Sequence, residues 1–97
     1  MATIYVDIDG TLTDNHAHRA GVPIKERIER VKKLLADGND VIIWSAGGSN
    51  PRNYAIEFCR EHGIEATAAL AKPQIVVDDK PKILARGLDV KSPKFLD

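Results

Sequence analysis

The stretch "YVDIDGTLTD", residues 5–14, places two acids, Asp7 and Asp9, where an apolar, strand-like segment ends. Residues 3–8, "TIYVDI", are rich in β-branched and aromatic side chains, which predicts a buried strand. Gly10 then allows the chain to leave the strand in a tight turn. Because burying like charges together is costly unless a cation or a reaction needs them, the acidic pair indicates a functional site.

Downstream of this pair, strand-like and helix-like segments alternate. Apolar residues recur at helical spacing after Pro23, and Gly38 suits the position just past the end of that helix. A second helix is expected to begin at Pro51 behind a cap by Ser49 or Asn50 and to end at Gly63. The remaining expected segments are strands at 40–46, at 64–70 (weak) and at 74–79, a short helical or irregular piece, an edge strand near 88–90 and a loose tail at 91–97.

Alternation of this kind predicts an α/β protein with a parallel sheet and right-handed crossovers. We expect a three-layer, Rossmann-like fold with four to five strands and helices on both faces. Its 97 residues are enough for one small domain, residues 1–97, with a flap-like loop at 10–22.

Composition narrows the range of partners. The 14 basic and 14 acidic residues balance, which argues against a general nucleic-acid binder or a membrane-surface protein. Nucleic acid is therefore expected only as a substrate. The single cysteine, Cys59, excludes an internal disulfide and is expected to be buried. The start of the chain reads as a strand and no apolar run approaches the ~20 residues of a membrane helix, so we expect a cytoplasmic protein without a membrane partner.

Polar groups are expected to collect at one edge of the predicted sheet, because ligands of such sheets bind beyond the carboxyl ends of the strands. Asp7 and Asp9 follow the first strand and Ser45 ends the second. Lys72 precedes the last predicted strand, which ends in the acids of 78–79. Four carboxylates at one edge repel one another unless they bind a hard cation that prefers oxygen ligands. Mg²⁺ is such a cation, and its sites often combine a few carboxylates with water and phosphate oxygens. Ser45 and Lys72 would then contact phosphoryl oxygens.

These motifs resemble the four motifs of the haloacid dehalogenase superfamily in the same order along the chain. They are "DIDGTLTD", the serine after "DVIIW", the Lys-Pro pair 72–73 and "IVVDDK", and together they span residues 3 to about 80. The resemblance implies a Mg²⁺-dependent phosphotransferase with an aspartate nucleophile, most often a phosphatase.

The resemblance also implies a role for each matching residue. Asp7 would attack phosphorus and form an aspartyl-phosphate, and Asp9 would act as general acid and then as general base. Thr11 and Ser45 would bind the phosphate, and Lys72 would steady both nucleophile and phosphate. The implied metal ligands are Asp7, Asp9 through its backbone carbonyl, Asp78 and Asp79, with the choice between the last two left open.

Other interpretations of single residues compete with these roles. Lys80 lies close to the acids of 78–79 and rivals Lys72 as the active-site lysine. An EF-hand loop is ruled out, since Thr11 and Leu12 occupy positions where it needs an acid or Asn and a Gly. His16 and His18 are too few for a transition-metal site and are expected to be solvated. Arg19 and Arg52 are surface candidates for substrate contact.

No stretch of the sequence looks like a cap domain. Without a cap, the site would be open. An open site suits a bulky phosphorylated substrate, such as the end of a macromolecule. It also suits a small phosphorylated substrate if a neighbouring subunit of a homo-oligomer covers the site.

Two rival functions remain. A phosphorelay receiver also uses carboxylates, Mg²⁺ and a Lys-Pro, but its acidic pair opens the chain and its Lys-Pro comes last, whereas here 78–79 follow Lys72. The other rival is a non-catalytic phosphate-binding module.

Overall fold

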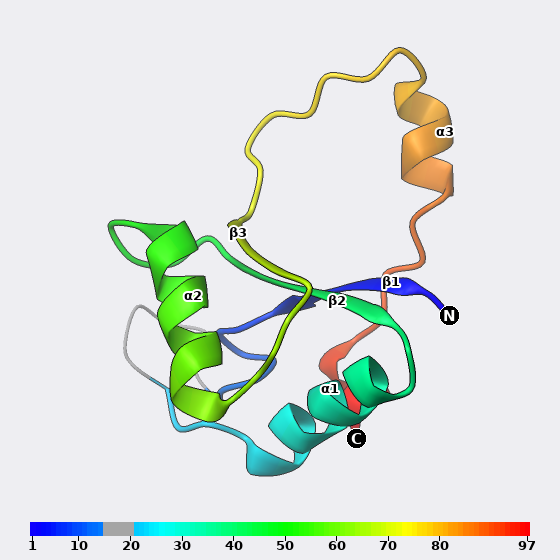
Figure 1. The fold of residues 1–97 in the computed structure, drawn as a ribbon. Helices are drawn as coiled ribbons and strands as arrows, with labels where there is room; N and C mark the ends of the chain where they lie inside the picture. Colours follow the sequence, from blue (N-terminus) through cyan, green and yellow to red (C-terminus); the bar gives the residue numbers. More distant parts are fainter. Residues whose placement is uncertain (15–20) are drawn as a thin grey trace.

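The structure is a computed structural model that describes residues 1–14 and 21–97 (Figure 1). Strands and helices alternate along the chain, as the sequence predicts, although fewer strands form. The elements are β1 (Thr3–Asp7), α1 (Lys25–Ala36), β2 (Asp40–Ser45), α2 (Pro51–His62), β3 (Ala68–Ala71), α3 (Pro81–Arg86) and a 3-10 helix, η1 (Pro93–Leu96).

The strands of the described chain form one parallel, three-stranded sheet in the order β1-β2-β3. Val6 lies beside Ile43 in the first pair, and Ile43 lies beside Ala69 in the second. All three strands therefore end at the same edge of the sheet. This small α/β layout is consistent with a Rossmann-like arrangement, but it contains three strands where four to five were expected.

Helices α1 and α2 pack on the same face of the sheet. Alternate strand residues such as Val6, Val41 and Ile43 are buried in one core together with Val31 of α1 and Phe58 of α2. The side chains between them point to the other face, where Tyr5 and Leu70 are 52% and 38% exposed. The ring of Tyr5 contacts that of Trp44 there in a tilted arrangement, with ring centroids 4.6 Å apart. The described elements therefore make two layers, in contrast to the three expected.

Local signals in the sequence explain the limits of α2. The side chain of Asn50 accepts a hydrogen bond from the amide of Asn53, and Pro51 occupies the first turn. The helix ends at Gly63, whose φ of 64° is the left-handed conformation that glycine adopts without strain. Cys59 faces the core from this helix, and burial raises the pKa of its thiol, as expected for a structural cysteine.

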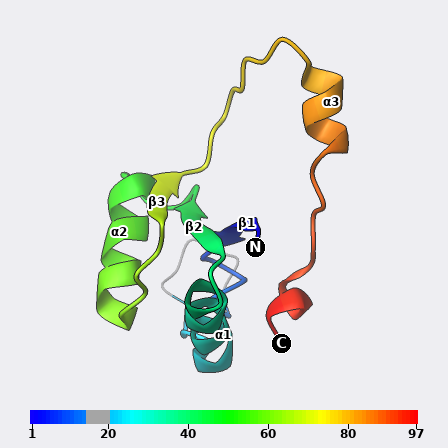
Figure 2. The same cartoon turned by 45° about the vertical axis from the view of Figure 1, so that its right-hand side comes forward.

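The stretch 74–79, which the sequence predicts as a strand, forms no strand here. Ile75 and Val77 are 83% and 94% exposed, and the chain leads away from the sheet after β3 toward α3 in both views (Figures 1 and 2). Only residues 72–73 connect it to β3, whereas a crossover between parallel strands needs about a dozen residues or more. A parallel strand at 74–79 is therefore incompatible with the position of β3.

The segment 91–97, expected as a loose tail, instead folds back on α1. Leu96 is 5% exposed and belongs to the core, and Arg27 pairs with Asp97 at 2.8 Å. Residues 88–90 form no strand, and of the expected flap 10–22 the part 15–20 lies outside the described residues. Nowhere in residues 1–14 and 21–97 is there a helix with the length and apolar character needed to cross a bilayer.

Candidate functional site

The turn that follows β1 carries Asp9 and Thr11 to the carboxyl edge of the sheet. The carbonyl of Ile8 accepts hydrogen bonds from the amides of Thr11, Leu12 and Thr13 at 3.1, 2.8 and 3.1 Å. Gly10, with φ of 82°, provides the left-handed step that this tight turn requires. Asp9 and Thr11 are thus held on a compact turn in which the amides of Thr11, Leu12 and Thr13 are satisfied.

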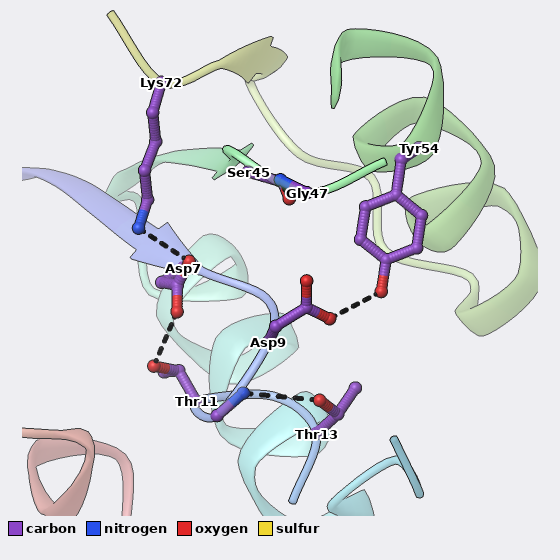
Figure 3. A network of polar contacts seen from close by, with 9 residues as sticks. Asp7, Asp9, Thr11, Thr13, Ser45, Gly47, Tyr54 and Lys72 are labelled. Atoms are coloured by element: carbon purple, nitrogen blue, oxygen red, sulfur yellow. Dashed lines mark hydrogen bonds and ion pairs between the residues drawn. The ribbon is translucent and has the colours of Figure 1, made fainter. Parts of the chain in front are cut away.

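Asp7 is held by two groups from different parts of the chain (Figure 3). Lys72 Nζ lies 2.8 Å from Asp7 Oδ1, and the hydroxyl of Thr11 donates to Asp7 Oδ2 at 3.3 Å. Both charged side chains stay about one-third exposed, at 35% for Lys72 and 30% for Asp7. A partly exposed pair of this kind stabilises the fold little, and its carboxylate remains open to an incoming group.

Lys72 reaches this position because β3 pairs with β2. Ala71 lies beside Ser45 in that pair, and the amide of Lys72 donates to the carbonyl of Ser45 at 2.8 Å. The lysine side chain then crosses over the end of β2 toward β1 (Figure 3). Pro73 favours the extended backbone of the residue before it, which suits this continuation of the strand.

The carboxylate of Asp9 points away from Asp7 and toward helix α2 (Figure 3). Its Oδ1 accepts a hydrogen bond of 2.7 Å from the hydroxyl of Tyr54. Its Oδ2 lies so close to Gly47 that a Cβ atom added there would be 2.8 Å away. The Asp9 side chain is therefore held between a phenol and a glycine backbone.

The environment of Tyr54 keeps its hydroxyl protonated. Burial, the hydrogen bond to Asp9 and the negative charges of Asp9, Asp7 and Glu61 together raise the pKa of Tyr54 to about 12. The phenol therefore stays a hydrogen-bond donor to Asp9 at neutral pH.

Ser45 lies beneath the site. It is 1% exposed, and its hydroxyl oxygen accepts a hydrogen bond of 2.9 Å from the amide of Gly47. This contact leaves the hydroxyl proton free for another acceptor and helps to fix the loop that packs against Asp9. Contact between Ser45 and a phosphate stays a prediction.

The structure does not bring Asp78 and Asp79 to the other acids. They lie on the exposed segment that leaves the sheet, where Asp78 accepts a hydrogen bond from the amide of Lys80. Within the described parts of the chain, no three acidic, histidine or cysteine side chains come together as metal ligands would. Of the two candidate lysines, Lys72 is the one in contact with Asp7.

Of the remaining candidates, the structure describes Arg52 alone. Arg52 is exposed in the first turn of α2, and His16, His18 and Arg19 lie outside the described residues.

The sequence did not predict that Tyr54 and Gly47 belong to the site. A signal was present, since Tyr54 belongs to the first turn of the helix that follows β2 and therefore lies at the carboxyl edge of the sheet. Nothing in the sequence marks Gly47 apart from its neighbour Gly48.

The cluster combines a carboxylate beside a cation with a second carboxylate held separately. Asp7 has the charge and exposure of a nucleophile, and Lys72 offers a positive charge to an anionic ligand. Asp9 can donate or accept a proton at the same edge. Such a set suits transfer of an anionic group more than it suits redox chemistry.

Comparison with known proteins supports the fold. No protein-family model and no curated protein matches the chain. Among solved structures, a conserved protein from Bacteroides thetaiotaomicron is 27% identical with a TM-score of 0.59, and 84% of each chain is covered. A protein from Vibrio cholerae, solved by crystallography, is 23% identical with a TM-score of 0.57 over 99% of this chain and 96% of the other. These similarities show a shared small α/β fold.

Proposed function

We propose that the protein is a small, capless phosphatase of the haloacid dehalogenase type that acts through an aspartyl-phosphate and requires Mg²⁺. The contact of Lys72 with Asp7, beside Asp9 at one edge of the sheet, carries this proposal, since Lys72 lies far along the chain from both acids. Asp7, Asp9 and Lys72 each match a position of the motifs quoted above. The contacts of each residue favour the role that the resemblance implies for it. The lack of a second cysteine fits the cytoplasm as its compartment.

In the first step, a carboxylate oxygen of Asp7 attacks phosphorus and the bond to the leaving oxygen breaks. Lys72 balances negative charge on the phosphoryl oxygens, and Asp9 gives a proton to the leaving oxygen. In the second step, Asp9 takes a proton from water, and the water oxygen attacks phosphorus and releases phosphate from Asp7. The products are an alcohol and inorganic phosphate, and the enzyme regains its starting protonation.

The donor set at the site fits Mg²⁺, which proteins often hold through one or two carboxylates completed by water and substrate phosphate. Asp7, with its partly exposed carboxylate, and the backbone carbonyl of Asp9 would hold it. When bound, the ion supplies positive charge that offsets the repulsion between Asp7 and an anionic substrate.

Asp78 and Asp79 remain proposed as further ligands. They follow Lys72 along a short stretch of chain, and Lys72 itself contacts Asp7. A bend within 73–77 would return them to the same carboxylate without forming a further strand. This arrangement differs from the one in Figure 1 and requires its own test, given in the Discussion.

An Asp7→Asn variant tests the proposal. With a phosphate monoester labelled in the phosphoryl group, we expect wild-type protein to release phosphate over many turnovers and, after an acid quench, to carry label on Asp7. The variant should do neither. Asp37→Asn, on the exposed end of α1, is the matched control and should behave as wild type.

The rival functions predict other results. A receiver-like domain would take up label without steady release of phosphate, and a non-catalytic module would do neither while still binding phosphate. Unchanged hydrolysis by Asp7→Asn would exclude Asp7 as nucleophile.

We further propose a phosphorylated substrate that meets an open site. Asp7 and Lys72 are partly exposed, and the described segments that follow β1 and β3 build no second domain over them. A macromolecular end, or a small ester enclosed by a neighbouring subunit, fits this opening. A screen of phosphorylated metabolites and of oligonucleotides phosphorylated at the 3′ or 5′ end would separate the two, and the oligomeric state in solution would show whether a second subunit is present.

A further inference from the structure

Tyr54 is the single side chain among the described residues with a hydrogen bond to the carboxylate of Asp9. The bond is short, at 2.7 Å, and joins the first turn of α2 to the turn after β1. It fixes one oxygen of Asp9, while the other rests against Gly47 (Figure 3). The orientation of Asp9 is thus set by contacts with the loop and helix after β2, with no contribution from Asp7 or Lys72.

We propose that Tyr54 is a positioning residue that, with Gly47, orients Asp9 for proton transfer to the leaving group. The inference rests on the proposed function, in which Asp9 is the general acid. A carboxylate on a turn can adopt several rotamers, and a general acid is effective only within hydrogen-bond reach of the atom it protonates. The hydrogen bond from Tyr54 to one carboxylate oxygen and the backbone of Gly47 beside the other restrict the rotamers that Asp9 can adopt.

Tyr54 itself need not touch the substrate. Its hydroxyl donates to Oδ1 of Asp9, so the proton that Asp9 gives to a leaving oxygen would sit on Oδ2, on the side of Gly47. Gly47 has no side chain to block this oxygen, which is the physical reason for a glycine there. Any larger residue would push the carboxylate aside, since its Cβ would lie 2.8 Å from Oδ2.

The dependence on the leaving group distinguishes positioning from a structural role. Esters of p-nitrophenol have a leaving group that departs with little need of a proton, whereas simple alkyl phosphates depend on protonation. For Tyr54→Phe, we expect kcat/KM to fall about ten- to a hundredfold with an alkyl phosphate and less than about threefold with p-nitrophenyl phosphate. Because kcat/KM reports only the steps up to transfer of the phosphoryl group, the later hydrolysis does not obscure the comparison.

Three further variants make the test specific. Gly47→Ala should give the same selective loss with Tyr54 intact, which covers the case in which Tyr54→Phe fails to fold. Tyr5→Phe alters the other tyrosine of the chain, on the open face of the sheet, and should leave both rates unchanged. In an Asp9→Asn background, Tyr54→Phe should have no further effect on either substrate, as expected if Tyr54 acts through Asp9.

Equal losses with the two substrates, no loss with either, or a full effect of Tyr54→Phe in the Asp9→Asn background would overturn the inference. Melting curves of each variant identify losses that come from unfolding. Failure of the proposed function gives a different pattern, because wild-type protein would then hydrolyse neither ester.

Discussion

Lys72 Nζ lies 2.8 Å from Asp7 Oδ1, a contact that joins the residue after β3 to the last residue of β1 across the end of β2. The contact forms only if β3 pairs in register with β2, and β3 is the shortest strand, Ala68–Ala71. The charge balance of the site therefore depends on a strand that contributes few buried side chains. Substitutions in β3 would affect the site through the position of Lys72.

Replacing Lys72 should reduce activity strongly and stability little. For Lys72→Ala, we expect kcat/KM with p-nitrophenyl phosphate to fall by about two orders of magnitude, as for the loss of a charge that stabilises a transition state. The free energy of unfolding should change by less than about 1 kcal/mol, because the ion pair is partly exposed. Lys80→Ala, on the exposed segment after β3, is the matched control, and equal losses for the two variants would reject the assignment of Lys72.

Magnesium should stabilise the folded protein. An ion that binds only the folded state adds about 2.7 kcal/mol to the free energy of unfolding at a hundredfold excess over Kd. We expect a rise in melting temperature with Mg²⁺ that is lost in Asp7→Asn. If Asp78 and Asp79 return to the site as proposed, replacing either with Asn reduces the shift. An unreduced shift in both variants would limit the ligands to the cluster seen in Figure 3.

The sequence predicted the elements whose signals are local. The limits of α2 follow from Asn50 and Gly63, and the strands β1 and β2 follow from short apolar runs between turn signals. The edge at which Asp7 and Lys72 meet follows from the rule for parallel sheets. These features were predictable because each depends on neighbouring residues or on a general property of the fold.

Features that depend on contacts between distant segments were harder to predict. The stretch 74–79 has the composition of a strand, but strand formation needs a partner, and the link through 72–73 is too short for a parallel crossover. Polar residues lie close to Leu96 in the sequence, which favours a loose tail, yet the side chain of Leu96 is buried in the core. Tyr54 could be placed on a helix, but its contact with Asp9 depends on how α2 packs.

Leu96 should contribute to stability although it lies in the last described helix. Its side chain is buried in the core, so Leu96→Ala should lower the free energy of unfolding by about 2 kcal/mol or more. Phe95→Ala is the matched control, because Phe95 is about half exposed, and it should cost less. Urea denaturation followed by circular dichroism measures both. Similar values for the two variants would mean that η1 does not dock on α1.

The pair of Arg27 and Asp97 should make stability depend on acid. Two nitrogens of Arg27 donate to the two oxygens of Asp97 at 2.8 and 3.2 Å, and these bonds hold the pKa of Asp97 below its ordinary value of 3.8. A carboxyl whose pKa is lower in the folded state stabilises it above the ordinary pKa. That contribution disappears as the pH falls through the folded value.

We therefore expect wild-type protein to be more stable than Asp97→Asn at pH 7, and the difference between the two to close below about pH 4. Thermal unfolding of both proteins from pH 7 to pH 2 measures it. Arg27 also donates to the carbonyl of Thr11 at 3.1 Å, so the pair braces the turn that carries Asp9. A difference that persisted at pH 2 would point to packing in place of charge.

The segment 74–79 offers a direct test of the arrangement after β3. Val77 is 94% exposed, so Val77→Asn should change the free energy of unfolding by no more than about 0.5 kcal/mol. Ile43→Val, which removes one methyl group from a fully buried position, should cost about 0.5–1.5 kcal/mol and serves as the core control. Because the open face of the sheet bears Trp44, the only tryptophan, its fluorescence quenching by acrylamide reports whether the segment covers that face. A large loss of stability in Val77→Asn, together with a shielded Trp44, would show that 74–79 packs against the sheet, and the acids that follow it would then lie closer to Asp7 than they do in Figure 1.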